Sequence, residues 1–196
     1  MGFTRAELES FRDATLPDLI GPGARLLFVG INPGLWTAAT QAHFARRGNR
    51  FYPALHLAGI IDRPIDASAG YRPEDRAYLL KCGIGITNLV PRATARADEL
   101  TVAELLAGGQ RLEAHVAELG VKVVAVLGIT AYRTAYARPK AVAGRQPETL
   151  GGAQLWVVPN PSGLNAHSSL ADLAAAYREV AVAAGLDVTA SGAGLG

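Results

Sequence analysis

Short apolar runs alternate with segments of helical periodicity along most of this chain. Four of these runs are expected to form strands, and they occupy residues 25–31, 83–89, 121–127 and 154–158. The first of them is apolar with a glycine at its end, which is typical of a strand that is covered on both faces. Strands that alternate with helices favour a parallel sheet between two helix layers. We therefore predict an α/β fold, a three-layer α/β/α sandwich with a roughly four-stranded parallel sheet.

Capping residues and terminal glycines or prolines mark the expected helices. These helices span residues 4–16, 49–59, 73–81, 102–119, 130–137 and 168–184. A polar loop is expected between the first strand and residue 48, and residues 138–152 are expected to be a surface excursion because they are rich in Pro and Gly. We divide the chain into an N-terminal helical extension (1–20), a main domain (21–186) and a flexible tail (187–196).

The composition limits the classes of protein that this chain can belong to. With 196 residues, of which 49% are hydrophobic, it is long enough to bury a core of its own. Its single cysteine, Cys82, excludes an internal disulfide and a Cys-ligated zinc or iron–sulfur site. No membrane span or signal peptide is recognisable, so we expect a cytoplasmic protein without a membrane partner. The net charge of +2 permits a polyanionic partner without requiring one.

Asparagine stands at the end of three of the four predicted strands, as Asn32, Asn88 and Asn160. Ligands of parallel sheets bind beyond the carboxyl ends of the strands, so we expect these residues to be neighbours, with the first and last strands ending side by side. Pro33 would fix the turn that aims the Asn32 side chain. The alternative is that Asn32 only hydrogen-bonds its own turn, as asparagines in loops often do.

These strand ends lack the usual signatures of strong catalytic groups. Paired carboxylates, a Ser–His–Asp arrangement and metal-spaced His or Asp clusters are absent, as are the Gly-rich motifs of nucleotide sites. We therefore expect neither a cofactor nor a metal. The pattern favours a reaction in which the leaving group does most of the work and an amide positions a water molecule.

Four motifs, in order, carry a resemblance to a known family. They are GINPGL at 30–35, GNRF at 48–51, GIGITNLVPRAT at 83–94 and NPSGL at 160–164. With these motifs the chain resembles the mismatch-specific uracil/thymine-DNA glycosylases, a branch of the uracil-DNA glycosylase superfamily. The resemblance implies a base excision repair enzyme that flips uracil, or thymine or another damaged base, out of mismatched DNA and hydrolyses its N-glycosidic bond. It implies no metal, cofactor or covalent lyase step.

The resemblance also implies roles for individual residues. Asn32 matches the family's catalytic asparagine, which orients water toward C1′ of the sugar, and Phe44 matches an aromatic that stacks on the flipped base. His43 is as readily a structural loop histidine as a base contact, and Asn88 can instead cap a turn after its strand. The residues placed around the base are Gly30, Ile31, Thr37, His43, Phe44 and Asn88.

A second set of residues is expected to contact DNA. Leu164 would act as a wedge that fills the gap left by the flipped nucleotide. The arginines near residue 48 would neutralise phosphates, although such a run is usually a solvated face. Many family members carry Arg near Ala166, so contacts to the opposite strand are not implied here. The predicted DNA contacts are Arg46, Arg47, Arg50, Asn160, Ser162, Gly163, Leu164, Asn165 and His167.

The expected partner is double-stranded DNA that contains uracil or a mismatched base, bound by a monomer. Two alternatives remain open from the sequence alone. The first is a non-catalytic module of the same fold that binds damaged or abasic DNA, and the second is an α/β protein that binds a nucleotide or sugar phosphate.

Overall fold

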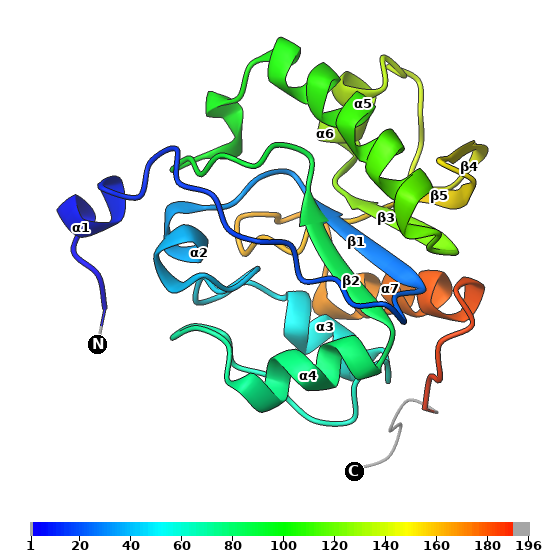
Figure 1. Ribbon diagram of the computed structural model, residues 1–196, viewed down its shortest axis with the longest axis horizontal. Helices are drawn as coiled ribbons and strands as arrows, with labels where there is room; N and C mark the ends of the chain where they lie inside the picture. Colours follow the sequence, from blue (N-terminus) through cyan, green and yellow to red (C-terminus); the bar gives the residue numbers. More distant parts are fainter. Residues whose placement is uncertain (1, 190–196) are drawn as a thin grey trace.

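A five-stranded sheet forms the centre of the protein in the computed structural model, which describes residues 2–189 (Figure 1). The strands are β1 (Leu26–Gly30), β2 (Ile84–Asn88), β3 (Val123–Leu127), β4 (Gly144–Leu150) and β5 (Ala153–Val158). Their order across the sheet is β2-β1-β3-β5-β4, with β4 antiparallel to β5 and every other neighbouring pair parallel. The predicted α/β fold is confirmed, with five strands where about four were expected.

Helices cover both faces of this sheet, α3, α4 and α7 on one side and α5 and α6 on the other (Figure 1). Side chains of one strand alternate between the two layers. Leu26 and Phe28 of β1 pack with α3 and α7, whereas Leu27 and Val29 pack with α5 and α6. The helices are α1 (Arg5–Glu9), α2 (Leu35–Thr40), α3 (Phe51–Leu57), α4 (Pro73–Lys81), α5 (Val102–Leu119), α6 (Ile129–Ala135), α7 (Leu170–Ala183) and the 3-10 helix η1 (Ala97–Glu99).

Local signals explain where the two central helices of the chain begin. Pro73 stands in the first turn of α4, where its missing N–H removes no helical hydrogen bond. Thr101 caps α5 by accepting a hydrogen bond from the backbone N–H of Glu104, whose carboxylate accepts from the Thr101 N–H in return. Helix α7 has the same arrangement with Ser169 and Asp172, so the expected cap at Ser168 lies one residue too early.

Two elements differ from the sequence prediction. Helix α2 lies within the segment expected to be a polar loop, and it begins after Gly34 without a side-chain cap. Strand β4 lies within the expected surface excursion 138–152, where Pro147 falls in a shift of register between Arg145 and Thr149. Proline is tolerated at an edge strand because no ladder hydrogen bond needs its nitrogen there.

The N-terminal extension is less helical than expected, because α1 covers five residues and the chain then turns, with Asp13 at a φ of 63°. Further on, Leu19 forms a bridge with Ile86 of β2, with hydrogen bonds of 3.0 and 2.8 Å in the two directions. This part of the chain therefore lies along the outer edge of β2.

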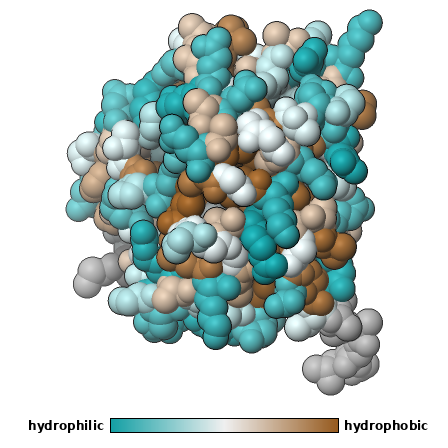
Figure 2. Space-filling view, turned by 45° about the vertical axis from the view of Figure 1, so that its right-hand side comes forward, coloured by the Kyte–Doolittle hydropathy of each residue, from teal (hydrophilic) through white to brown (hydrophobic). Residues whose placement is uncertain are grey.

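The predicted tail begins at residue 187, and its residues 190–196 lie outside the described residues. Within the described part, the Thr189 N–H donates to the Gly59 carbonyl at 3.0 Å. No helix between residues 2 and 189 is both long and apolar enough to cross a bilayer. On the face seen in Figure 2, hydrophilic residues surround an apolar area near the middle.

Candidate active site

A pocket of about 160 Å³ opens at the carboxyl ends of the parallel strands. It brings together Asn32, Asn88 and Asn160, which follow or end β1, β2 and β5. The expectation that the first and last predicted strands end side by side is wrong, because β3 lies between β1 and β5. The loops after β1 and β5 instead meet across the end of β3, where Leu127 lines the pocket. The volume lies below the roughly 300 Å³ at which sites for drug-sized ligands begin, so the pocket suits a single small ring.

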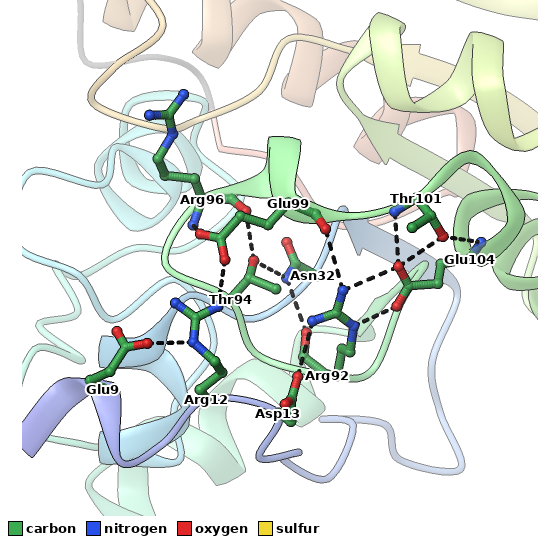
Figure 3. Close-up of polar contacts among 10 residues, drawn as sticks. All are labelled: Glu9, Arg12, Asp13, Asn32, Arg92, Thr94, Arg96, Glu99, Thr101 and Glu104. Atoms are coloured by element: carbon green, nitrogen blue, oxygen red, sulfur yellow. Dashed lines mark hydrogen bonds and ion pairs between the residues drawn. The ribbon is translucent and has the colours of Figure 1, made fainter.

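The side chain of Asn32 is held by its nitrogen (Figure 3). Nδ2 donates one hydrogen bond to the carbonyl of Arg92 at 3.0 Å and another to Oγ1 of Thr94 at 2.8 Å. Within residues 2–189, Oδ1 accepts no hydrogen bond, and the backbone N–H groups of Ile31 and Asn32 donate none. The anchored amide therefore presents a free acceptor oxygen, with two free backbone donors in the same corner of the pocket.

Gly30, Phe44 and Asn88 form one wall of the pocket. Phe44 is half-buried and stacks on Phe51 with ring centroids 4.1 Å apart and an interplanar angle of 28°. Phe44 also lines the pocket, so its ring is suited to contact a planar ligand there. Thr37, a buried residue of α2, also lines the pocket.

His43 lines the pocket too, but its ring is bound to the protein. The residue is 2% exposed, and its Nε2 lies 3.1 Å from the carbonyl oxygen of Pro17. A carbonyl only accepts hydrogen bonds, so Nε2 must carry the proton, and only Nδ1 is left to contact a ligand. Burial lowers the pKa of His43 to about 4, so the ring is neutral at physiological pH.

The loop 159–168 between β5 and α7 closes another side of the pocket and extends toward the end of the sheet where α2 lies (Figure 1). Asn160 accepts a hydrogen bond from the Ser162 N–H at 2.9 Å and, through its carbonyl, another from Asn165 at 3.0 Å. These bonds shape a tight turn, and at its tip Leu164 is 79% exposed, more than any other large apolar side chain of the described residues. His167 is exposed beside it.

Arg50 holds this loop to the rest of the molecule. Its guanidinium donates to the carbonyls of Ser162, Asn165 and Ser168 at 3.0, 2.8 and 2.6 Å. Arg50 therefore shapes the loop, whereas the sequence predicted a phosphate contact. Close packing supports the same arrangement, because a Cβ on Gly163 would lie 2.8 Å from the carbonyl oxygen of Gly48.

The other two arginines of the predicted basic group, Arg46 and Arg47, are exposed, and Arg46 also lines the pocket. They lie in the loop between α2 and α3, next to the tip that carries Leu164. The guanidinium group of Arg46 is therefore placed to meet a polyanion that approaches the mouth of the pocket, and Arg47 follows it in the same exposed loop.

A profile of the Uracil DNA glycosylase superfamily matches residues 17–182 of this chain, which includes every residue of the pocket described above. The chain belongs to the Uracil DNA glycosylase superfamily. The predicted superfamily is thereby confirmed, and the family is one of DNA glycosylases.

A solved structure shows the same superfamily fold. It is a solution NMR structure of a Methanosarcina acetivorans protein that is provisionally named a uracil DNA glycosylase. The two chains superpose with a TM-score of 0.53 at 15% sequence identity, and the match covers 85% of this chain and 96% of that chain. At this identity the likeness establishes the fold, including the layers that position the pocket.

The pocket also contains residues that the sequence did not single out. Thr94 lines it and holds Asn32, and Asn49 lines it while accepting a hydrogen bond from the Phe51 N–H at 2.9 Å at the start of α3. Both stand within quoted motifs, GIGITNLVPRAT and GNRF, so the signal was present. What the motifs did not reveal was the contact each residue makes.

The charged residues that line the pocket are both arginines. Its lining includes Arg46 and Arg96 but neither Asp nor Glu. In the part of the chain that the structure describes, no three His, Cys, Asp or Glu side chains gather in a way that could hold a metal ion. The pocket can therefore position groups by amides, backbone N–H groups and an aromatic face, and it holds no carboxylate to act as a base.

Proposed function

We propose that this protein excises uracil from double-stranded DNA, acting on mismatched bases as the mismatch-specific branch of the superfamily does. The observation that carries the proposal is the anchored amide of Asn32, whose free oxygen lies in a pocket sized for one base. The same pocket is closed by the loop that exposes Leu164. Thymine and other damaged bases are further candidate substrates.

The reaction breaks the C1′–N1 bond, and both electrons of that bond leave with the base. Negative charge gathers on the pyrimidine and positive charge on the sugar. The free N–H groups of Ile31 and Asn32 are suited to stabilise the departing anion, in the manner of an oxyanion hole. Oδ1 of Asn32 accepts a hydrogen bond from a water molecule and orients its oxygen toward C1′.

An amide oxygen is a weak proton acceptor, and the pocket has no carboxylate. The attacking water is therefore positioned more than it is activated, so the stability of the leaving anion controls the rate. This chemistry supports slow turnover and a preference for bases that leave readily. Selection between bases that differ by one methyl group is worth only about 1–3 kcal/mol, which allows several related substrates.

One aromatic and one aliphatic side chain are suited to stabilise the complex in which the base is flipped out of the duplex. The ring of Phe44, which lines the pocket, offers a stacking surface for the extruded base. Leu164 can enter the stack and replace the lost base contacts. Ala166 stands near the position where many members of that branch carry arginine, so we do not propose strong selection for guanine in the other strand.

The experiment uses a labelled duplex with one uracil opposite guanine, incubated with excess protein and then treated with hot alkali. Strand scission at the uracil is expected with the native chain and is expected to be lost in Asn32→Ala. The same variant should still bind a duplex that contains an abasic site. Undiminished single-turnover scission by Asn32→Ala would contradict the role of Asn32. Binding of the native chain without any scission would favour the non-catalytic alternative.

A further inference from the structure

The backbone carbonyl that anchors the Asn32 amide belongs to Arg92, and the side chain of Arg92 contacts three other parts of the chain. The guanidinium of Arg92 pairs with both carboxylate oxygens of Glu104 at the start of α5, with Nη2 to Oε2 at 3.1 Å. It also pairs with Oδ1 of Asp13 at 3.0 Å and reaches the Glu99 carbonyl at 3.4 Å. The hydrogen bonds from Arg92 lower the pKa of Glu104 to about 2, so this pair stays charged across the ordinary assay range.

The second anchor of Asn32 is held by the same part of the chain. Oγ1 of Thr94 donates to the Arg96 carbonyl at 2.7 Å, and the Arg96 N–H donates to Oε1 of Glu99 at 2.8 Å. The other oxygen of Glu99 pairs with Arg12, which also pairs with Glu9 (Figure 3). Both anchors of the amide therefore lead back to residues 12–14.

The backbone makes the same connection. The Asp13 N–H donates to the Ala93 carbonyl at 2.9 Å, and the Ala93 N–H donates to the Ala14 carbonyl at 2.9 Å. Ala93 lies between the two residues that hold Asn32. Residues 12–14 precede residue 17, where the superfamily match begins. They lie outside the matched residues and fasten the loop that carries both anchors.

We propose that residues 12–14 form a brace that fixes the loop 92–94 and thereby the orientation of the Asn32 amide. The catalytic consequence rests on the proposed function, whereas the effect on the amide does not. An isolated exposed ion pair contributes little to folding, so a merely structural contact would leave Asn32 unchanged. A brace predicts that loosening residues 12–14 frees the Asn32 side chain while the fold and DNA binding persist.

The test variant is Arg12→Ala combined with Asp13→Asn in the full chain. Asparagine keeps the left-handed backbone that Asp13 adopts. The pair of changes removes the Arg12–Glu99 contact and reduces the Asp13–Arg92 ion pair to a weaker hydrogen bond with a neutral acceptor. The matched control is Arg138→Ala, which removes an exposed ion pair with Glu148 at 3.2 Å at the far edge of the sheet. Should the double variant unfold in urea titrations, Asp13→Asn alone replaces it.

The first measurement is hydrogen exchange of the Asn32 side-chain amide, followed by NMR after selective ¹⁵N labelling of the asparagines, of which the native chain has five and the double variant six. Asn32→Ala identifies the signal by its disappearance. In the double variant we expect this exchange to become about tenfold faster, because its anchoring loop opens more often. The control should match the native chain. Native exchange rates in the double variant would overturn the brace.

The second measurement is single-turnover excision, with the affinity for an abasic duplex beside it. If the attacking water is misplaced in the double variant, its excision rate constant should be about tenfold lower than that of the native chain. Its Kd for the abasic duplex should change by less than about twofold. Faster exchange with an unchanged rate constant would overturn the catalytic consequence. If the native chain excises nothing, the proposed function fails, and the exchange measurement still decides whether the brace exists.

Discussion

Gly30 and Asn88 face each other in register across β1 and β2, and a Cβ on Gly30 would lie 2.5 Å from Oδ1 of Asn88. Real Cβ atoms do not approach an oxygen so closely. Glycine at position 30 is therefore what allows the Asn88 side chain to lie against the β1 backbone at the mouth of the pocket. The same Cβ would be 3.5 Å from the Phe44 ring, which is an ordinary contact.

Gly30→Ala should lower the free energy of unfolding by about 1–3 kcal/mol, because either Asn88 or the strand must move. Excision should fall with it, since Gly30 and Asn88 both line the pocket and either movement changes its wall. Urea denaturation and single-turnover excision measure the two effects. Gly23→Ala is the stability control, because a Cβ there meets nothing within 4 Å and the residue lies outside the pocket. Equal stability of Gly30→Ala and the native chain would disprove the clash.

Leu164→Ala should lower excision from duplex DNA about tenfold, since truncating a buried leucine loses at least about 1.4 kcal/mol of apolar contact in the flipped complex. Excision from single-stranded DNA should change much less, because no stack has to be filled. Single-turnover rates on the two substrates give the comparison. Val182→Ala removes a similarly exposed apolar side chain from α7 and should affect neither. Equal losses on both substrates would remove the wedge role.

The DNA affinities of the Arg47→Ala and Arg50→Ala variants should depend differently on salt concentration. Arg47→Ala removes an exposed cation and should reduce the slope of log K against log salt concentration by about 1. Arg50→Ala should leave the slope unchanged but lower the free energy of unfolding by about 1–3 kcal/mol, because three loop carbonyls lose their donor. Binding titrations at several salt concentrations, with urea denaturation, separate the two. A reduced slope in Arg50→Ala would instead support the predicted contact of Arg50 with a DNA phosphate.

His43 should make stability depend on pH in mildly acidic solution. Its pKa is lowered to about 4 in the folded protein, so between pH 6.5 and 4 the unfolded chain binds a proton that the folded chain does not. Stability must therefore fall as pH falls through this window, by about 2–3 kcal/mol between pH 7 and 4.5 from this group. His43→Gln should lose that part of the pH dependence in urea denaturation. An identical pH dependence in both proteins would rule out the buried neutral ring.

Signals confined to a few neighbouring residues account for the elements that the sequence predicted well. Pro73 and the Thr101–Glu104 capping box place the starts of α4 and α5 at the residues observed. Helix α2 has six residues and no side-chain cap, so nothing local distinguishes it from a loop. Strand β4 is defined by its antiparallel pairing with β5. Its segment is rich in Pro and Gly, so the sequence predicted a surface loop there.

The motifs predicted which residues line the pocket better than what each residue does there. Asn32 lies 60 positions from Arg92 in the chain, and Arg50 lies 118 positions from Ser168. Contacts over such separations depend on how the sheet orders its strands, which periodicity does not reveal. For the same reason the insertion of β3 between β1 and β5 could not be read from the order of the strands in the sequence.

The bridge between Leu19 and Ile86 has a consequence for how copies of this chain behave when crowded on DNA. The two hydrogen bonds use the N–H and C=O groups of Ile86 that an incoming strand would need. At the opposite side, β4 is bent by its irregular register and carries a proline without a donor. Neither border is a good template for intermolecular β pairing, so the chain should resist aggregation even where many molecules gather on one stretch of damaged genome.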